Sequence, residues 1–146
     1  MAQHDSYIPR KTLAQRLVET ETFLASFSDQ KALISHFIEL SYANEEPSVD
    51  FMVDKNVVPG CQVMIYIALI HDQESQLISF RMHAQSRIIG GLLQLLMTTF
   101  NPCTKSEVMS LPANFAKAGV WKLLFSSSRR QASAKILDHM IYLASQ

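Results

Sequence analysis

Residues 63–82, VMIYIALIHDQESQLISFRM, determine the fold class of this chain. The first eight of them, residues 63–70, are all apolar and rich in β-branched side chains, which is typical of a short buried strand rather than a helix. Residues 71–75 make a polar turn, and from there apolar and polar side chains alternate as far as Met82. This pattern predicts an antiparallel β-hairpin in the middle of the chain.

Helical periodicity precedes the hairpin. Apolar side chains recur every three or four residues over 13–27 and again over 33–40, as they do on one face of a helix. Ser28 or Asp29 is a suitable N-cap for the second of these helices.

Helices are also predicted after the hairpin. Residues 86–100 are apolar on nearly all sides, which is typical of a central helix. Short helices are expected over 104–111, opened by a Thr104–Glu107 capping box, and over 112–118, and a terminal helix begins near Ser128. Together these elements predict an α+β domain. In it, a small antiparallel sheet, the hairpin with a third strand, packs against five to six helices, with helices at both termini.

Two adjacent glycines interrupt the predicted central helix. Each of Gly90 and Gly91 costs the helix about 1 kcal/mol relative to alanine. Such a cost is typical of a place where another element approaches the helix backbone closely, and we therefore predict a close contact here.

Length and composition favour one domain without nucleic-acid or membrane partners. The chain has 146 residues, 48% of them hydrophobic, which suits a single domain over 1–146 with a loose N-terminal segment at 1–11. Thirteen basic and thirteen acidic side chains cancel, so the net positive charge of a general nucleic-acid binder is missing. The longest apolar run has eight residues, whereas a membrane span needs about twenty. Without an apolar signal segment, a cytoplasmic protein is expected.

The glycine and cysteine counts exclude several kinds of site. Four glycines cannot form the spaced motifs that bind dinucleotides or phosphates. Two cysteines cannot supply a disulfide framework or a four-thiolate metal site, and the five histidines lack ligand spacing. We therefore expect no metal site.

The segment Pro59-Gly60-Cys61-Gln62 is the strongest candidate for chemistry. Proline followed by glycine favours a type II turn, in which glycine takes a positive φ. Cys61 would then lie at the tip of a turn, just before a buried strand. A free thiol has a pKa of about 8.5 and reacts as thiolate. The alternative is a small apolar side chain that fills the end of the strand.

Four blocks of the sequence resemble the SufE family, the sulfur acceptors of iron–sulfur cluster assembly. Residues 58–62, Val-Pro-Gly-Cys-Gln, followed by an apolar strand, look like the active-site segment of that family. Residues 38–40, 88–93 and 124–129 resemble the end of its second helix, the start of its central helix and the start of its last helix. The resemblance covers about residues 12–144 in the right order and implies a SufE/IscU-like fold.

The resemblance implies an accessory sulfur-transfer protein rather than a stand-alone enzyme. Such a protein docks on a cysteine desulfurase of the SufS or CsdA kind, and PLP belongs to that partner, so the acceptor has no cofactor of its own. Cys61 would carry the persulfide and pass sulfur to an iron–sulfur scaffold of the SufBCD kind or to another acceptor. The implied active-site loop also contains Val58, Pro59, Gly60 and Gln62.

Members of this family hold the cysteine in an apolar pocket at rest, and the loop opens on docking. The apolar side chains of Val57, Val58 and Val63 are compatible with such a pocket. Burial would raise the pKa of the Cys61 thiol until a partner supplies a base.

The chain departs from the family pattern at three positions that bear on partner choice and rate. Val63 replaces a serine, Gln85 an aspartate and Gly90 a lysine. Gln85 and Arg129 are the residues expected to contact a partner. The alternative function is a SufE-fold protein that binds or regulates a desulfurase without carrying sulfur.

The second cysteine, Cys103, has no counterpart in the family pattern and is expected to be structural. A role in resolving a bond at Cys61 would require the two Cα atoms to lie within about 7 Å. A cluster scaffold of the related U-type fold is a third alternative, but it needs about three cysteine ligands and the chain has two.

Overall fold

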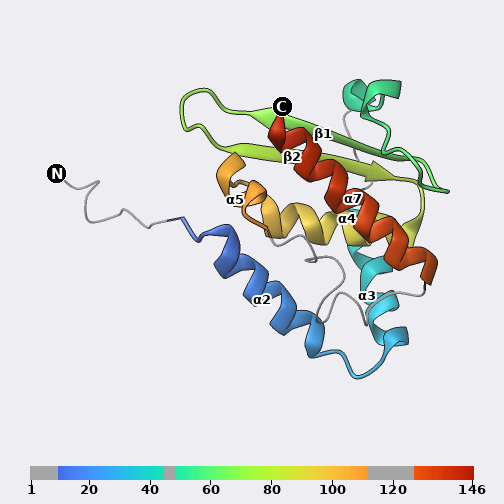
Figure 1. Cartoon of the computed structure of the whole chain (residues 1–146). Coiled ribbons are helices and arrows are strands. Elements are labelled where there is room, and N and C mark those ends of the chain that lie inside the picture. The colour runs from blue at the N-terminus through green and yellow to red at the C-terminus, as the bar shows by residue number, and fades with distance from the viewer. Residues whose placement is uncertain (1–9, 45–48, 112–126) are drawn as a thin grey trace.

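The computed structural model describes residues 10–44, 49–111 and 127–146 (Figure 1). Its helices are α2 (Leu13–Ala25), α3 (Gln30–Ser41), α4 (Arg87–Phe100), α5 (Lys105–Met109) and α7 (Ser127–Ser145), and its strands are β1 (Ile65–His71) and β2 (Ile78–Ala84). Three short 3₁₀ helices, η1 (Tyr42–Asn44), η2 (Val49–Phe51) and η3 (Asp54–Asn56), lie between α3 and β1. The α+β class is therefore confirmed. The helix expected over 112–118 and residues 1–9 of the expected loose segment lie outside the described residues.

The predicted hairpin is present, two residues further along the chain than expected. Ile65 pairs with Ala84 at one end of the antiparallel ladder, and His71 pairs with Ile78 at the other. Residues 63 and 64 are left out of β1 and belong to the loop that the bond from the N–H of Val58 to the carbonyl of Ile65, 2.8 Å long, closes. The ladder ends at the pair of Ile65 and Ala84, and Ser86 already caps α4, so β2 has ended where residues 63 and 64 would pair.

The prediction of a third strand is wrong for the described part of the chain, where the sheet has two strands. Each outer edge instead carries a single bridge, from Val57 to Tyr66 on β1 and from Cys103 to Ile78 on β2. The chain leaves the sheet at once in both places. Val57 leads into the turn that contains Cys61, and Cys103 directly precedes the N-cap of α5.

The side chain of Asn101 takes the place of a strand residue on the outer edge of β2. Its Nδ2 donates to the carbonyl of Phe80 and its Oδ1 accepts from the N–H of Phe80, both at 2.7 Å. Asn101 follows the last residue of α4, so these two bonds fix the end of the central helix against the sheet.

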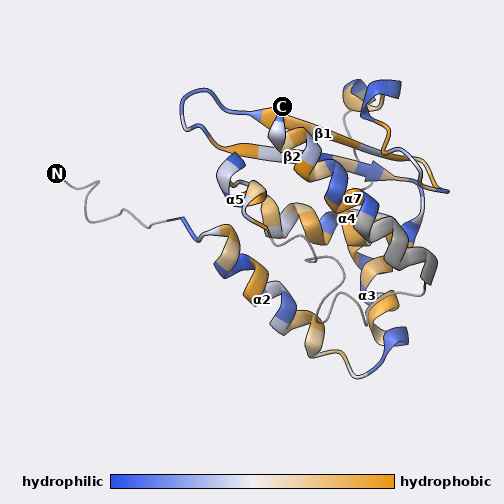
Figure 2. Cartoon of the chain, in the orientation of Figure 1, coloured by the Kyte–Doolittle hydropathy of each residue, from blue (hydrophilic) through white to orange (hydrophobic). Residues whose placement is uncertain are grey.

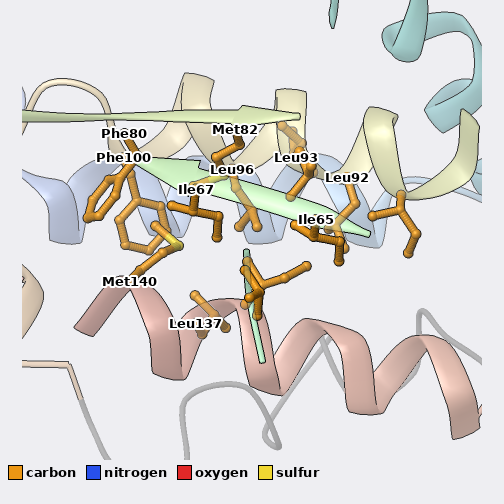
Figure 3. Close-up of a cluster of buried hydrophobic side chains, with 14 of the residues drawn as sticks. Ile65, Ile67, Phe80, Met82, Leu92, Leu93, Leu96, Phe100, Leu137 and Met140 are labelled. Atoms are coloured by element: carbon orange, nitrogen blue, oxygen red, sulfur yellow. The ribbon is translucent and has the colours of Figure 1, made fainter. Parts of the chain in front are cut away.

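One face of the hairpin is buried under two helices. Side chains at alternate positions of both strands, among them Ile65, Ile67, Phe80 and Met82, are buried, whereas their neighbours on the other face are at least partly exposed. Figure 3 shows these side chains meeting residues of α4 and α7 in one cluster. The hydrophobic effect on this single face therefore stabilises a two-layer arrangement.

The close contact predicted at the glycine pair is confirmed at Gly91. A Cβ atom on Gly91 would lie 1.8 Å from the carbonyl oxygen of Phe37, so α3 crosses α4 with backbone against backbone. The α4 helix is predominantly apolar, as Figure 2 shows, and Leu92, Leu93 and Phe100 are completely buried. It is the central helix that the sequence predicted.

Two helices begin at the capping residues that the sequence predicted. Asp29 caps α3, and the capping box of Thr104 and Glu107 opens α5 as expected. Glu107 also accepts a hydrogen bond from the N–H of Leu13 at 2.7 Å and pairs with Arg10 at 2.9 Å, which ties α5 to the start of α2. No helix of the described residues is long and apolar enough to cross a membrane.

Candidate functional site

Cys61 lies in a loop whose two ends are fixed to the sheet. The loop, residues 59–64, is closed by the bond from Val58 N–H to the carbonyl of Ile65. Val58 is only 2% exposed and belongs to the hydrophobic core. The loop is therefore anchored at its base, while the segment between the anchors projects from the end of the hairpin.

The predicted turn geometry is present at the tip of this loop. Gly60 has a φ of 80°, the left-handed region that the Pro-Gly signal requires. Pro59, Gly60 and Gln62 are exposed, and Cys61 between them is half-buried. The turn therefore presents the cysteine at the molecular surface without releasing it from the protein.

The Cys61 side chain packs against the edge of the hydrophobic core. Burial raises the pKa of its thiol, and the ammonium group of Lys135 acts in the opposite direction. Of the valines expected to shelter it, Val58 is buried and Val57 is half-buried, whereas Val63 is 39% exposed. Cys61 is therefore sheltered on its core side and remains partly exposed.

Lys135 of α7 is the residue at this site that sequence reasoning missed. Its Nζ donates a hydrogen bond to the carbonyl oxygen of Gly60, directly before Cys61. The two residues are far apart in the sequence, and only the packing of α7 along β1 brings them together. No local pattern around Lys135 signals this contact.

Gln85 lies at the same end of the sheet as Cys61. It follows Ala84, which pairs with Ile65, the first residue after the loop. A pocket of about 180 Å³ opens here, lined by Ser41, His83, Ala84, Gln85, Ser86, Arg87 and Gly90. Gln85 and Gly90, two of the departures from the family pattern, thus line one pocket.

Arg129, the other expected contact residue, lies in the first turn of α7. Its side chain is outside the described residues. Along the helix, Lys135 follows it after six residues, about 9 Å of axial rise. The expectation that Arg129 contacts a partner stays a prediction.

Cys103 lies at the opposite end of the sheet. It bridges Ile78, which pairs with His71, whereas Cys61 precedes Ile65, so the length of β1 places the cysteines roughly 20 Å apart. This separation is far beyond the roughly 7 Å between Cα atoms that a disulfide allows, which excludes a resolving role for Cys103 in this conformation. Both cysteines are free. Cys103 is 0% exposed, and burial, with Glu107 nearby, raises the pKa of its thiol to about 11. It is an inert core residue.

Two large apolar side chains are exposed within the Cys61 loop. Val63 is 39% and Met64 55% exposed, directly before β1 begins. Contiguous exposed apolar side chains are common where a partner protein binds. Among the described residues, no group of three or more His, Cys, Asp or Glu side chains could hold a metal ion.

Comparison with known proteins places the chain in a family. No curated protein matches its sequence. The family model described as SufE, Fe-S metabolism associated domain, matches residues 18–144, which is most of the chain and includes the Cys61 loop and all elements from α3 to α5. The chain therefore belongs to the SufE family, whose domain is associated with Fe–S metabolism.

Proposed function

We propose that this protein is a sulfur acceptor that docks on a PLP-dependent cysteine desulfurase. It takes persulfide sulfur onto Cys61 and passes it to an iron–sulfur scaffold or another sulfur acceptor. The observation that carries this proposal is the position of Cys61, a half-buried thiol directly after the Pro59-Gly60 turn, in a loop anchored by Val58 and Ile65, in a member of the SufE family.

The proposed reaction is a thiol–disulfide type of exchange. The Cys61 thiol first gives its proton to solvent or to a base of the partner. The thiolate then attacks the terminal sulfur of the partner's cysteine persulfide. A new S–S bond forms at Cys61, the S–S bond in the partner breaks, and the partner's cysteine leaves as thiolate. The sulfane sulfur moves without net oxidation or reduction of the pair.

Partial burial of Cys61 suits a carrier of this kind. The core side of the sulfur is shielded from water, which protects a persulfide from reductants in solution. Because burial also raises the pKa of the Cys61 thiol, the isolated protein holds it in the unreactive form. Docking on the exposed side chains of Val63 and Met64 would bring a base of the partner to the thiol.

Intact-mass measurement tests the proposal. The protein is incubated with a cysteine desulfurase and cysteine, and a mass gain of about 32 Da is expected, one sulfur atom as persulfide. Cys61→Ser should show no gain, and Cys103→Ala should gain the same mass as the wild type. If Cys61→Ser gains mass as readily as the wild type, the proposal is wrong.

A pull-down with the same desulfurase separates the alternative function. If the wild type binds the enzyme but never gains sulfur, and Cys61→Ser binds equally well, the chain is a binding or regulatory partner. The proposal requires binding and loading together.

A further inference from the structure

Lys135 attaches the C-terminal helix to the turn that carries Cys61. Its Nζ bonds to the Gly60 carbonyl, and a Cβ atom on Gly60 would lie 3.1 Å from that Nζ. The amine therefore lies directly over the turn. The next two residues, Ile136 and Leu137, are buried in the core, so the helix backbone behind the lysine is held in place.

The charge of Lys135 has no carboxylate partner among the described residues. Their ion pairs join Arg10 with Glu107, Lys11 with Glu19 and Arg81 with Asp50. A carbonyl oxygen satisfies one N–H of this exposed ammonium group, but it is not an anion and does not neutralise the charge. The nearest group of the turn that can become an anion is the sulfur of Cys61, one residue after the bonded carbonyl.

We propose that Lys135 is a positioning residue whose ammonium group, held over the turn by Gly60, stabilises the negative charge on the sulfur of Cys61. This inference rests on the proposed function for its role in transfer, although its effect on the free thiol does not. Lysine acts here as a point charge on a flexible stem and exchanges no proton with the sulfur.

The charge would serve two stages of the transfer. Before transfer, the anion is the Cys61 thiolate. After transfer it is the terminal sulfur of the persulfide, about 2 Å further out. A lysine side chain can follow that displacement, whereas a backbone N–H could not. When a docked partner excludes water from the loop, the attraction between ammonium and sulfur becomes stronger.

The direction of the electrostatic effect agrees with this role. Burial raises the pKa of the Cys61 thiol, and Lys135 opposes that rise. Without the lysine only the unfavourable effect of burial would remain. The turn would then hold a thiol that ionises even less readily in the resting protein.

The test is the pH dependence of Cys61 alkylation by iodoacetamide in the full chain. Lys135→Met removes the charge and keeps the length of the side chain, and it should move the alkylation midpoint upward by about 0.5–1 pH unit. At pH 7 the alkylation rate should fall roughly 3- to 10-fold, because only the thiolate reacts. Lys135→Arg keeps the charge and should restore most of the wild-type profile.

Lys105→Met is the matched control. Lys105 also donates a hydrogen bond to a main-chain oxygen, that of Gln146 at 3.4 Å, but it lies just after Cys103 at the opposite end of the sheet. This variant should keep the wild-type midpoint. Cys61→Ser supplies the blank for any reaction at Cys103. If Lys135→Met and the wild type share one midpoint, the proposal is wrong.

Sulfur loading then separates this inference from the proposed function. Lys135→Met should load persulfide more slowly than the wild type at pH 7, and its loading rate should approach the wild-type rate as the pH rises. A shifted alkylation midpoint without any sulfur loading, even in the wild type, would overturn the proposed function and leave the role of Lys135 toward the thiolate standing. Normal loading with an unshifted midpoint would overturn only the role of Lys135.

Discussion

Gly91 of α4 lies against the backbone carbonyl of Phe37 in α3, so close that a Cβ atom would fall 1.8 Å from the carbonyl oxygen. Backbone cannot move aside as a flexible side chain can. The two helices therefore hold their separation only while this position has no side chain.

Gly91→Ala should lower the free energy of unfolding by at least about 3 kcal/mol, because α3 and α4 must separate to admit the methyl group. The intrinsic preference of alanine for helices acts the other way and is worth only about 1 kcal/mol. Urea unfolding followed by circular dichroism measures the difference. Thr98→Ala, an exposed position of the same helix, is the control and should stay within about 0.5 kcal/mol of the wild type. Equal stability of the two variants would contradict this packing.

Gly60→Ala should destabilise the Cys61 turn. At a φ of 80° an L-residue with a Cβ atom is strained by roughly 1–2 kcal/mol, and asparagine tolerates this region better. Gly60→Asn should therefore be the milder of the two variants in urea unfolding. Both should also disturb the Lys135 bond and lower the rate of sulfur loading. A stability of Gly60→Ala equal to that of the wild type would show that the turn does not need the positive φ.

Glu107 should make the free energy of unfolding depend on pH in the acidic range. Burial alone would raise the pKa of Glu107, but hydrogen bonds from the N–H groups of Leu13 and Thr104 and from Arg10 outweigh it and lower that pKa. A carboxyl group with a lowered folded-state pKa stabilises the fold above its unfolded value, about 4.3, and this contribution is lost as the pH falls through the folded value.

Glu107→Gln should therefore cost about 1–2 kcal/mol at pH 7, with the difference from wild type shrinking below about pH 4. Urea unfolding at a series of pH values measures the difference. Glu19→Gln removes an exposed ion pair with Lys11 and should cost less than about 0.5 kcal/mol at pH 7. A pH-independent difference for Glu107→Gln would mean that its charge is unimportant.

Cys103→Ala should affect stability and not sulfur chemistry. Removing a fully buried sulfur leaves a small cavity, at a cost of roughly 1–2 kcal/mol. Because Cys103 lies at the far end of the sheet from Cys61, persulfide loading measured by intact mass should be unchanged. Loss of loading in a variant that remains folded would overturn the structural assignment of Cys103.

The elements that the sequence predicted well are those encoded by neighbouring residues. The alternation before Met82, the all-round apolar stretch of α4, and the capping box at Thr104 and Glu107 each depend on residues within a few positions of one another. The paired glycines also predicted a contact with a distant segment, because their cost to the helix indicated that another element crosses it there. They did not indicate that this element would be α3, which meets the helix at Gly91.

The features that could not be predicted depend on contacts between distant segments. A third strand was expected beside the hairpin, but the edges carry single bridges at Val57 and Cys103, where the chain turns away. Cys61 could be found because its turn has a local signature. Lys135 could not, because an exposed lysine on a helix carries no signal until α7 packs against β1.

The Asn101 side chain has a consequence for how molecules of this protein meet one another. The outward-facing N–H and C=O groups of Phe80 and Ile78 are those that a strand of a second molecule would pair with, and Asn101 and Cys103 already occupy them. Unpaired strand edges are templates for aggregation. Without these bonds, a strand of a second molecule could pair with the open edge of β2 in this apolar hairpin. The bonds that fasten the end of α4 thus also block strand addition at Ile78 and Phe80 of this edge.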